Sequence, residues 1–389
     1  MDLQVPNANL VAEYCRRILS DVLDELVNQV PNGLTNNWDN VKQSLRSITN
    51  MYQNGLRYAH SNFRSDWNDP ANRCAYVFVY LMQHCYLVNG SLQYSDVVAK
   101  SWRNKSNLKV CSIGGGPGSD LVGVTIFLRE NRIFPPSLEC LVLDLYPTWK
   151  DTWDTIYRQL PGSFTVSYRE CDLVRDTKLR GQDLQFVKQA DILTLSKSFS
   201  AVSAFFRQDR SGSKGNFLRN LLRATKPGCF VLYIDNDYVG CTQFQQNFAS
   251  RAGLDMVFEF RGKPTCPSGQ YSHTIRKYCQ LFDFRPMRTC NVIIQLFRKK
   301  GSVQSAIGDN PTESNLARTF TEQATVAQVP PSAIVAGPSR GRPTIRQHNP
   351  KRVQSRMTGG SHYGTIDNSG IIQDVETKAK TCCTGCTIL

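Results

Sequence analysis

The sequence lacks any apolar run long enough to cross a bilayer, although 41% of its 389 residues are hydrophobic. Its first residues, MDLQVPNANL, also lack the basic stretch and the following apolar stretch of a secretory leader. With no sign of secretion, the fourteen cysteines are expected to be reduced thiols rather than a disulfide framework. These absences argue against a membrane-spanning protein and a small disulfide scaffold, and they predict a cytosolic globular chain with a large core.

A zinc-binding pattern is also missing from the body of the chain. Cys266, His273, Cys279 and Cys290 form the one internal cluster with suitable residue types, but it contains no C-x-x-C pair and matches no zinc spacing. No structural metal is therefore expected.

Acidic residues are few relative to basic ones, with 32 Asp and Glu against 46 Lys and Arg and a net charge of +14. Most of the excess falls in residues 106–300, where 27 basic and 17 acidic residues give +10. Such a domain can attract nucleic acid, an acidic protein or an anionic membrane surface. A simply solvated basic surface explains the charge equally well.

Residues 1–105 are predicted to form an N-terminal helical layer. Residues 9–30 and about 39–63 show helical spacing of apolar side chains. The segment that begins at Pro70, PANRCAYVFVYLMQHCYLVNG, is apolar nearly all round and is expected to be a buried helix. We interpret His84 in this helix as a structural histidine rather than a functional one.

From Leu108 onward, strand and helix signals alternate, which is typical of an α/β domain with a mostly parallel sheet. Helices are predicted over 119–130, around Trp149–Ile156 and before Gly228. Seven strands are predicted, over residues 108–113, 138–144, 164–168, 189–196, 229–235, 254–260 and 290–297.

A glycine loop follows the first predicted strand, in the segment LKVCSIGGGPGSD. Gly114, Gly116 and Gly118 lack Cβ atoms where the backbone turns sharply and a ligand can approach closely. The dinucleotide pattern G-x-G-x-x-G would place its last glycine at Ser119, so G-x-G-x-G fits better. A tight structural turn remains an alternative interpretation of this loop.

Over residues 108–300 the order of features resembles the class I S-adenosylmethionine (SAM)-dependent methyltransferase family. The glycine loop, an acid at the end of the second strand, an acid after the third, and LLRATKPGCFVLYID around the fifth all match, although Cys229 replaces a usual glycine. The resemblance implies a three-layer Rossmann-like sheet of seven strands with the last one antiparallel. It also implies SAM as the cofactor.

The resemblance further implies roles for individual residues. Gly114, Gly116 and Gly118 would pass beneath the methionine part of SAM, and Asp144 would accept hydrogen bonds from both ribose hydroxyls. The adenine would meet Cys171, Asp172 and Leu173, and Ser196 would lie beside the cofactor at the end of the fourth strand. Asp144 and Asp172 could instead merely cap strand ends or turns.

The methyl acceptor is not identified by any motif. After the fourth strand the chain has neither the [DN]-P-P-[YFW] motif of exocyclic-amine methyltransferases nor the cysteine of cytosine-C5 enzymes. Ser196, Lys197 and Ser198 are catalytic candidates by position alone. A protein, an RNA and a small molecule all remain open as acceptors, as does a catalytically inactive scaffold.

Residues 301–389 are predicted to be a disordered basic tail, because they have too few large apolar groups to form a core. The final residues CTIL resemble a C-a-a-X box, which implies geranylgeranylation of Cys386. Cys382 and Cys383 are suitable for palmitoylation. With the basic segment 339–356 attracted to anionic lipids, the tail is expected to hold the protein at a cytoplasmic membrane face, with a cytosolic pool.

Overall fold

The computed structural model describes residues 19–31, 36–54, 65–160, 162–237, 243–266, 272–301 and 386–388. Predictions for the start of the first helix, for most of the tail, and for Cys382 and Cys383 lie outside the described residues.

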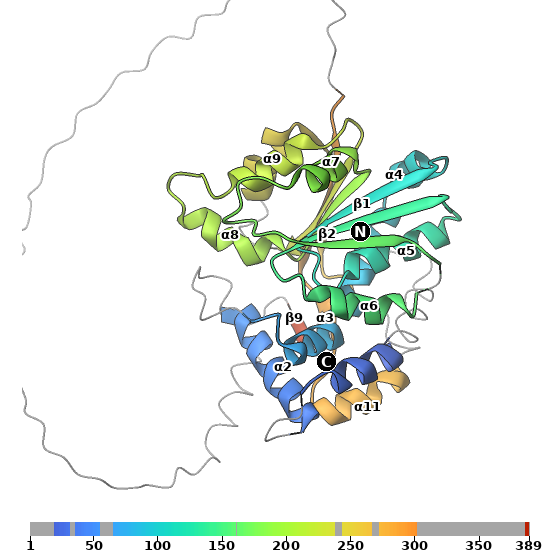
Figure 1. Cartoon of the computed structure of the whole chain (residues 1–389), viewed down its shortest axis with the longest axis vertical. Helices are drawn as coiled ribbons and strands as arrows, with labels where there is room; N and C mark the ends of the chain where they lie inside the picture. The colour runs from blue at the N-terminus through green and yellow to red at the C-terminus, as the bar shows by residue number, and fades with distance from the viewer. Residues whose placement is uncertain are drawn as a thin grey trace, which may run out of the picture. The chain divides into compact units, whose positions relative to one another are not determined.

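A seven-stranded mixed sheet forms the centre of the fold, with strand order β3-β2-β1-β4-β5-β8-β6 (Figure 1). β8 runs opposite in direction to the other six strands of this sheet, so the sequence-based prediction of fold class and of an antiparallel last strand is confirmed. All seven predicted strands are present, as β1 (Asn107–Ile113), β2 (Ser137–Asp144), β3 (Thr165–Glu170), β4 (Ile192–Ser196), β5 (Phe230–Asn236), β6 (Leu254–Gly262) and β8 (Val292–Lys299).

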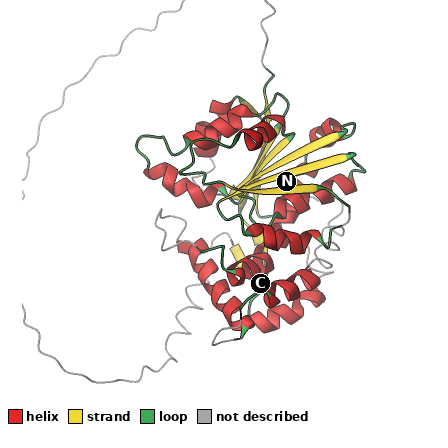
Figure 2. Cartoon of the chain, viewed as in Figure 1, coloured by secondary structure: helices red, strands yellow, loops and turns green. Residues whose placement is uncertain are grey.

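Helices cover both faces of the sheet, and Figure 2 shows the strands between two helical layers. Successive strand residues point to opposite faces, so Val110 and Cys111 belong to different hydrophobic clusters. The first cluster includes α3 (Pro70–Gln93), α4 (Asp96–Trp102), α5 (Ser119–Glu130) and α6 (Trp149–Tyr157). The second includes α7 (Gly181–Gln189), α8 (Phe199–Gln208) and α9 (Asn216–Ala224).

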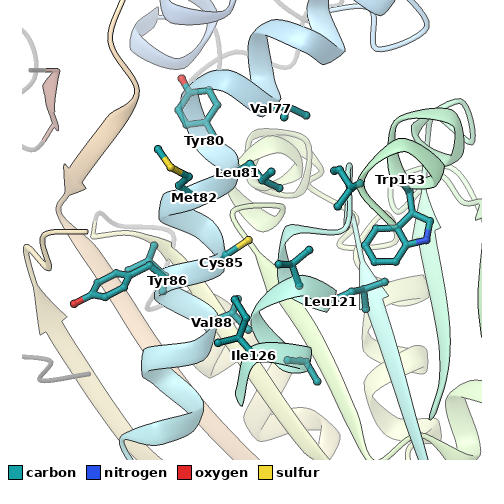
Figure 3. Close-up of a cluster of buried hydrophobic side chains, with 14 of the residues drawn as sticks. Val77, Tyr80, Leu81, Met82, Cys85, Tyr86, Val88, Leu121, Ile126 and Trp153 are labelled. Atoms are coloured by element: carbon teal, nitrogen blue, oxygen red, sulfur yellow. The ribbon is translucent and has the colours of Figure 1, made fainter. Parts of the chain in front are cut away.

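The long helix α3 is buried along almost its whole length. Asp69 caps its start by accepting a hydrogen bond from Ala71 N. Pro70 is tolerated in the first turn because backbone N–H groups there have no acceptor within the helix, so the absence of an N–H on proline costs no hydrogen bond. Gly123 lets α5 pack closely against α3, since a Cβ there would lie 2.7 Å from Val88 Cβ. Figure 3 shows Cys85 and Val88 of α3 packing beside Leu121 and Ile126 of α5.

The N-terminal helical layer contains a helix over residues 19–28, α2 (Asn37–Asn54) and α3. A helix from the far end of the sheet domain, α11 (Ser272–Phe282), packs against this layer. Tyr278 Oη donates to Ser20 O at 2.7 Å, and the rings of Trp38 and Phe282 lie 5.6 Å apart. Helices α7, α8 and α11 have no counterpart among the helices predicted from sequence.

Short elements complete the described chain. The π-helical turn η3 (Gln245–Ala249) and the 3₁₀ turn η4 (Ser250–Ala252) lead into β6. The predicted strand 290–297 is divided, because Cys290 ends a separate strand β7 (Met287–Cys290) and β8 begins at Val292. β7 pairs antiparallel with β9 (Cys386–Ile388), which places Cys386 opposite Cys290.

Candidate active site

The glycine loop joins the end of β1 to the start of α5. Gly114, Gly116 and Gly118 have φ values of 64°, 51° and 79°, in the left-handed region that favours glycine. A Cβ on Gly114 would lie 2.5 Å from Ser198 Cβ, and one on Gly118 would overlap the Trp153 ring. Both glycines are therefore required by packing as well as by backbone conformation.

Gly116 differs from the other two because a Cβ placed there would make only ordinary van der Waals contact. The nearest atom to a Cβ placed there is Trp149 Cε2, at 3.7 Å. Its backbone is fixed on both sides, since Gly116 N donates to Asp144 Oδ2 at 2.9 Å and Gly116 O accepts from Tyr168 Oη at 3.1 Å. The loop thus presents a rigid, uncrowded glycine beside a carboxylate, which suits close approach by a ligand.

Asp144 ends β2 and lies within this arrangement, with 9% of its surface exposed. Its Oδ1 accepts from Tyr146 N at 2.9 Å, so each carboxylate oxygen already has one backbone donor and keeps capacity for a second. Burial raises the pKa of the Asp144 carboxyl to about 6, although the N–H groups of Tyr146 and Gly116 oppose the shift. Above that pH the group is an acceptor-only carboxylate.

Asp120 is a second buried carboxylate in this region, and it was not among the site residues predicted from sequence. It accepts hydrogen bonds from Ser112 Oγ on β1 at 2.5 Å, from Thr194 Oγ1 on β4, and from Leu121 N at 3.0 Å. Burial raises its pKa. The signal in the sequence was a hydroxyl residue within each of two mostly apolar strands, Ser112 in β1 and Thr194 in β4. In the structure, the hydrogen bonds from these two hydroxyls to Asp120 connect α5 to the centre of the sheet.

Cys171, Asp172 and Leu173 follow β3 and continue along the same edge of the sheet. Cys171 N donates to Asp144 O at 2.8 Å, which places this tripeptide next to the end of β2. Asp172 Oδ1 accepts from Val174 N at 2.8 Å and from Arg175 N at 3.1 Å, so its side chain stabilises the backbone turn that begins at Asp172. Cys171 and Leu173 are buried.

Several serine hydroxyls at this edge have no partner within the part of the chain that the structure describes. They are Ser119 Oγ at the start of α5, Ser196 Oγ at the end of β4, and Ser198 Oγ just after that strand. Buried polar atoms without a protein partner are typical of places where water or a ligand supplies the hydrogen bond. Ser198 also contacts the glycine loop at Gly114.

Lys197, between these serines, has the left-handed φ of 59° that a non-glycine residue rarely adopts. This conformation costs about 1–3 kcal/mol and is common at functional sites. Lys197 N donates to Ile234 O at 2.7 Å, and Lys197 Nζ donates to Asn236 Oδ1 at 2.7 Å. The side chain is buried and turned toward the end of β5.

The predicted residues therefore gather along one edge of the sheet, at the carboxyl ends of β1, β2, β3 and β4. In open α/β sheets this edge is where ligands bind. Among the described side chains, no three of His, Cys, Asp and Glu are grouped so as to hold a metal ion. None of the helices in the described ranges is long and apolar enough to span a membrane.

The SAM expected from sequence fits the residues that form this edge. The missing side chain of Gly116 allows close approach, the Asp144 carboxylate can accept hydroxyl donors, and the unpaired serine hydroxyls offer further polar contacts. The start of α5 adds N–H groups, because its N-cap Gly118 has no side chain to occupy them.

No family model and no curated protein matches the chain. Solved structures similar to it include a protein described as an RNA methyltransferase from Pyrococcus horikoshii, with 14% identity, 66% of this chain and 98% of that chain covered, and a TM-score of 0.34. A protein described as a class I SAM-dependent methyltransferase from Listeria monocytogenes is 11% identical. The match covers 77% of this chain and 91% of that chain, with a TM-score of 0.36. A protein described as an O-methyltransferase family protein from Burkholderia thailandensis is 16% identical. The match covers 68% of this chain and 69% of that chain, with a TM-score of 0.32.

Proposed function

We propose that this chain is a SAM-dependent methyltransferase with its cofactor site at the glycine loop and Asp144. The observation that carries the proposal is the direct hydrogen bond between Gly116 N and Asp144 Oδ2, which joins the two predicted cofactor elements in one rigid unit. Bound SAM supplies an electrophilic methyl group on a sulfonium sulfur. Asp144 holds the ribose hydroxyls, and the Cys171–Leu173 segment borders the adenine.

The serine hydroxyls and the start of α5 are proposed to orient the remaining polar groups of the cofactor. Methyl transfer needs the acceptor atom in line with the methyl group, so positioning accounts for much of the catalytic effect. The role of the protein is then to fix the cofactor on the rigid strand ends and to hold the acceptor beside it.

The pH dependence of SAM binding tests this proposal through Asp144. Because its pKa is about 6, the acceptor-only carboxylate dominates at pH 7 and falls to about a tenth of the population at pH 5. We expect the dissociation constant for SAM to be about tenfold larger at pH 5 than at pH 7, measured by equilibrium dialysis of the full chain. A constant affinity over this range would contradict the role of Asp144.

Other groups around Asp144 affect this titration little, with one exception. Burial raises the pKa values of Tyr76 and Tyr168 well above their usual range and also raises that of Cys171, so all three stay neutral between pH 5 and 7. Asp120 also has a raised pKa and interacts with Asp144. The same titration on Asp120→Asn, a variant that keeps Asp144, separates the two carboxyls.

We also propose that the chain ending at Leu389 is held at a cytoplasmic membrane face by a prenyl group on Cys386. The support is the C-a-a-X pattern with two further cysteines just upstream. In eukaryotic cells, Cys386→Ser should move the protein from the membrane fraction to the cytosol, whereas Thr384→Ser, which keeps the box, should leave it at membranes. A wild-type protein found wholly in the cytosol would rule out the anchor.

A further inference from the structure

Polar and aromatic residues form a stripe on one side of the buried helix α3. Tyr76, Tyr80, Gln83 and His84 are spaced as i, i+4, i+7 and i+8, which places them on one helical face. A helix buried against a sheet needs no such stripe for stability. Gln83 is fully buried, and its Oε1 has no partner in the part of the chain that the structure describes.

This stripe is connected to the end of β4 through Cys290. Gln83 Nε2 donates to Cys290 Sγ at 2.9 Å, and Lys197 Nζ lies 3.5 Å from the same sulfur. Burial and the nearby Lys197 ammonium lower the pKa of His84 to about 3, so His84 is neutral at physiological pH. Lys197 is therefore the cation at the centre of the arrangement.

The charge of Lys197 is only partly balanced by its surroundings. No carboxylate in the described ranges lies within 4.0 Å of its ammonium group. The carboxyl that it influences is Asp235, whose oxygens accept from Ser200 N at 2.7 Å and from Asn236 N at 2.8 Å. A buried cation with a neutral amide as its close polar partner is suited to receive an anion.

Aromatic rings extend the stripe to the glycine loop. The ring centroids of Trp67, Tyr76 and Trp149 lie 5.3–5.5 Å from one another, and Trp149 is also the nearest side chain to a Cβ placed on Gly116, at 3.7 Å. Tyr76 Oη is 3.3 Å from His84 Nδ1. A continuous set of side chains thus runs from the proposed cofactor loop, across flat aromatic surfaces, to Lys197.

Among the described groups near Lys197, the carboxyl is that of Asp235, which is fully buried and whose oxygens already accept from Ser200 N and Asn236 N. His84 is too weakly basic at neutral pH, and burial raises the pKa of Tyr76 well above its usual value. The other neighbours are the Asn236 and Gln83 amides and the Cys290 thiol. An acceptor bound here can reach its nucleophilic form by losing its proton to solvent, with Lys197 favouring the anion.

We propose that the methyl acceptor is a small phenol, whose ring packs on the aromatic stripe and whose oxygen binds Lys197 as the phenolate. The inference rests on the proposed methyltransferase function. The phenol first releases its proton to solvent. A lone pair on the oxygen then forms the new O–CH₃ bond while the S–CH₃ bond breaks and its electron pair returns to sulfur, which leaves an aryl methyl ether and S-adenosylhomocysteine. Lys197 gives up no proton in this step.

The test uses 4-nitrophenol, a phenol that ionises near neutral pH and whose phenolate absorbs visible light. It is titrated at pH 6 with the full chain, with and without S-adenosylhomocysteine. We expect wild-type protein to increase the phenolate absorbance and to lower the apparent pKa of the probe by at least one unit, a tenfold change in its ionisation equilibrium. Lys197→Met should abolish the shift, and Lys197→Arg should retain part of it.

Lys188→Met is the matched control, because Lys188 is an exposed lysine on α7 that takes no part in the stripe. It should leave the shift unchanged. No shift with wild-type protein, or the same shift with Lys197→Met, would overturn the phenol proposal. The affinity for SAM is measured on the same samples, so a protein that binds SAM without shifting the probe refutes only this inference, and one that binds no SAM refutes the proposed function.

Discussion

Gly116→Ala is expected to weaken SAM binding at least tenfold while leaving the protein folded. The added methyl group would meet nothing closer than 3.7 Å within the described chain, so its cost to stability is that of the left-handed backbone, about 1–2 kcal/mol. The same methyl group would intrude where a ligand must approach the loop closely. The measurements are calorimetric SAM affinity and thermal unfolding.

Gly212→Ala provides a control for backbone strain. Gly212 has a φ of 69°, and a Cβ there would meet nothing within 4 Å. The two variants should unfold at similar temperatures, but only Gly116→Ala should lose affinity for SAM. Gly118→Ala should behave differently from both and be strongly destabilised, because its methyl group overlaps the Trp153 ring. If Gly116→Ala bound SAM as tightly as Gly212→Ala, the loop would be only a structural turn.

Asp144→Asn is expected to weaken SAM binding about 100-fold. Hydrogen bonds to a charged acceptor contribute about 1.5–3 kcal/mol each, and the amide cannot accept two hydroxyl donors as the carboxylate can. The effect on folding should be smaller, since two changes oppose each other. The amide nitrogen of the variant faces either Gly116 N–H or Tyr146 N–H, and this contact between two donors destabilises the fold. The substitution also removes a buried carboxylate, a group whose pKa burial raises to about 6, and this second change stabilises the fold.

Glu170→Gln is the matched control for this substitution. Glu170 is the residue paired with Asp144 on the neighbouring strand β3, and its side chain is exposed. The same exchange of carboxylate for amide should leave SAM affinity and unfolding temperature unchanged there. Equal affinity of the two variants would remove Asp144 from the cofactor site.

The sheet could be predicted from sequence because its signals are local. Each strand is a short apolar run that ends at a turn, and the glycine loop and Asp144 directly follow β1 and complete β2. The amphipathic α8 was missed, although its buried face is formed by residues such as Phe199 and Phe206. Its apolar spacing is short and interrupted by serines, so the final packing rather than the local pattern identifies it.

The α3 stripe could not be predicted because its meaning depends on contacts between distant parts of the chain. In sequence, His84 is one histidine in an apolar helix, and the partner of Gln83 is Cys290, 207 positions away. The left-handed backbone of Lys197 likewise has no signature in residue type, since lysine does not favour it. Only the fold shows that these residues and the glycine loop belong to one edge.

Calorimetric titration of the folded full chain with SAM, S-adenosylhomocysteine and NAD⁺ tests the central claim most directly. We predict one site that binds SAM and S-adenosylhomocysteine with micromolar affinity and shows no comparable binding of NAD⁺. Folded protein that binds neither SAM nor S-adenosylhomocysteine, or that binds NAD⁺ more tightly, would contradict the assignment of this edge as a SAM site.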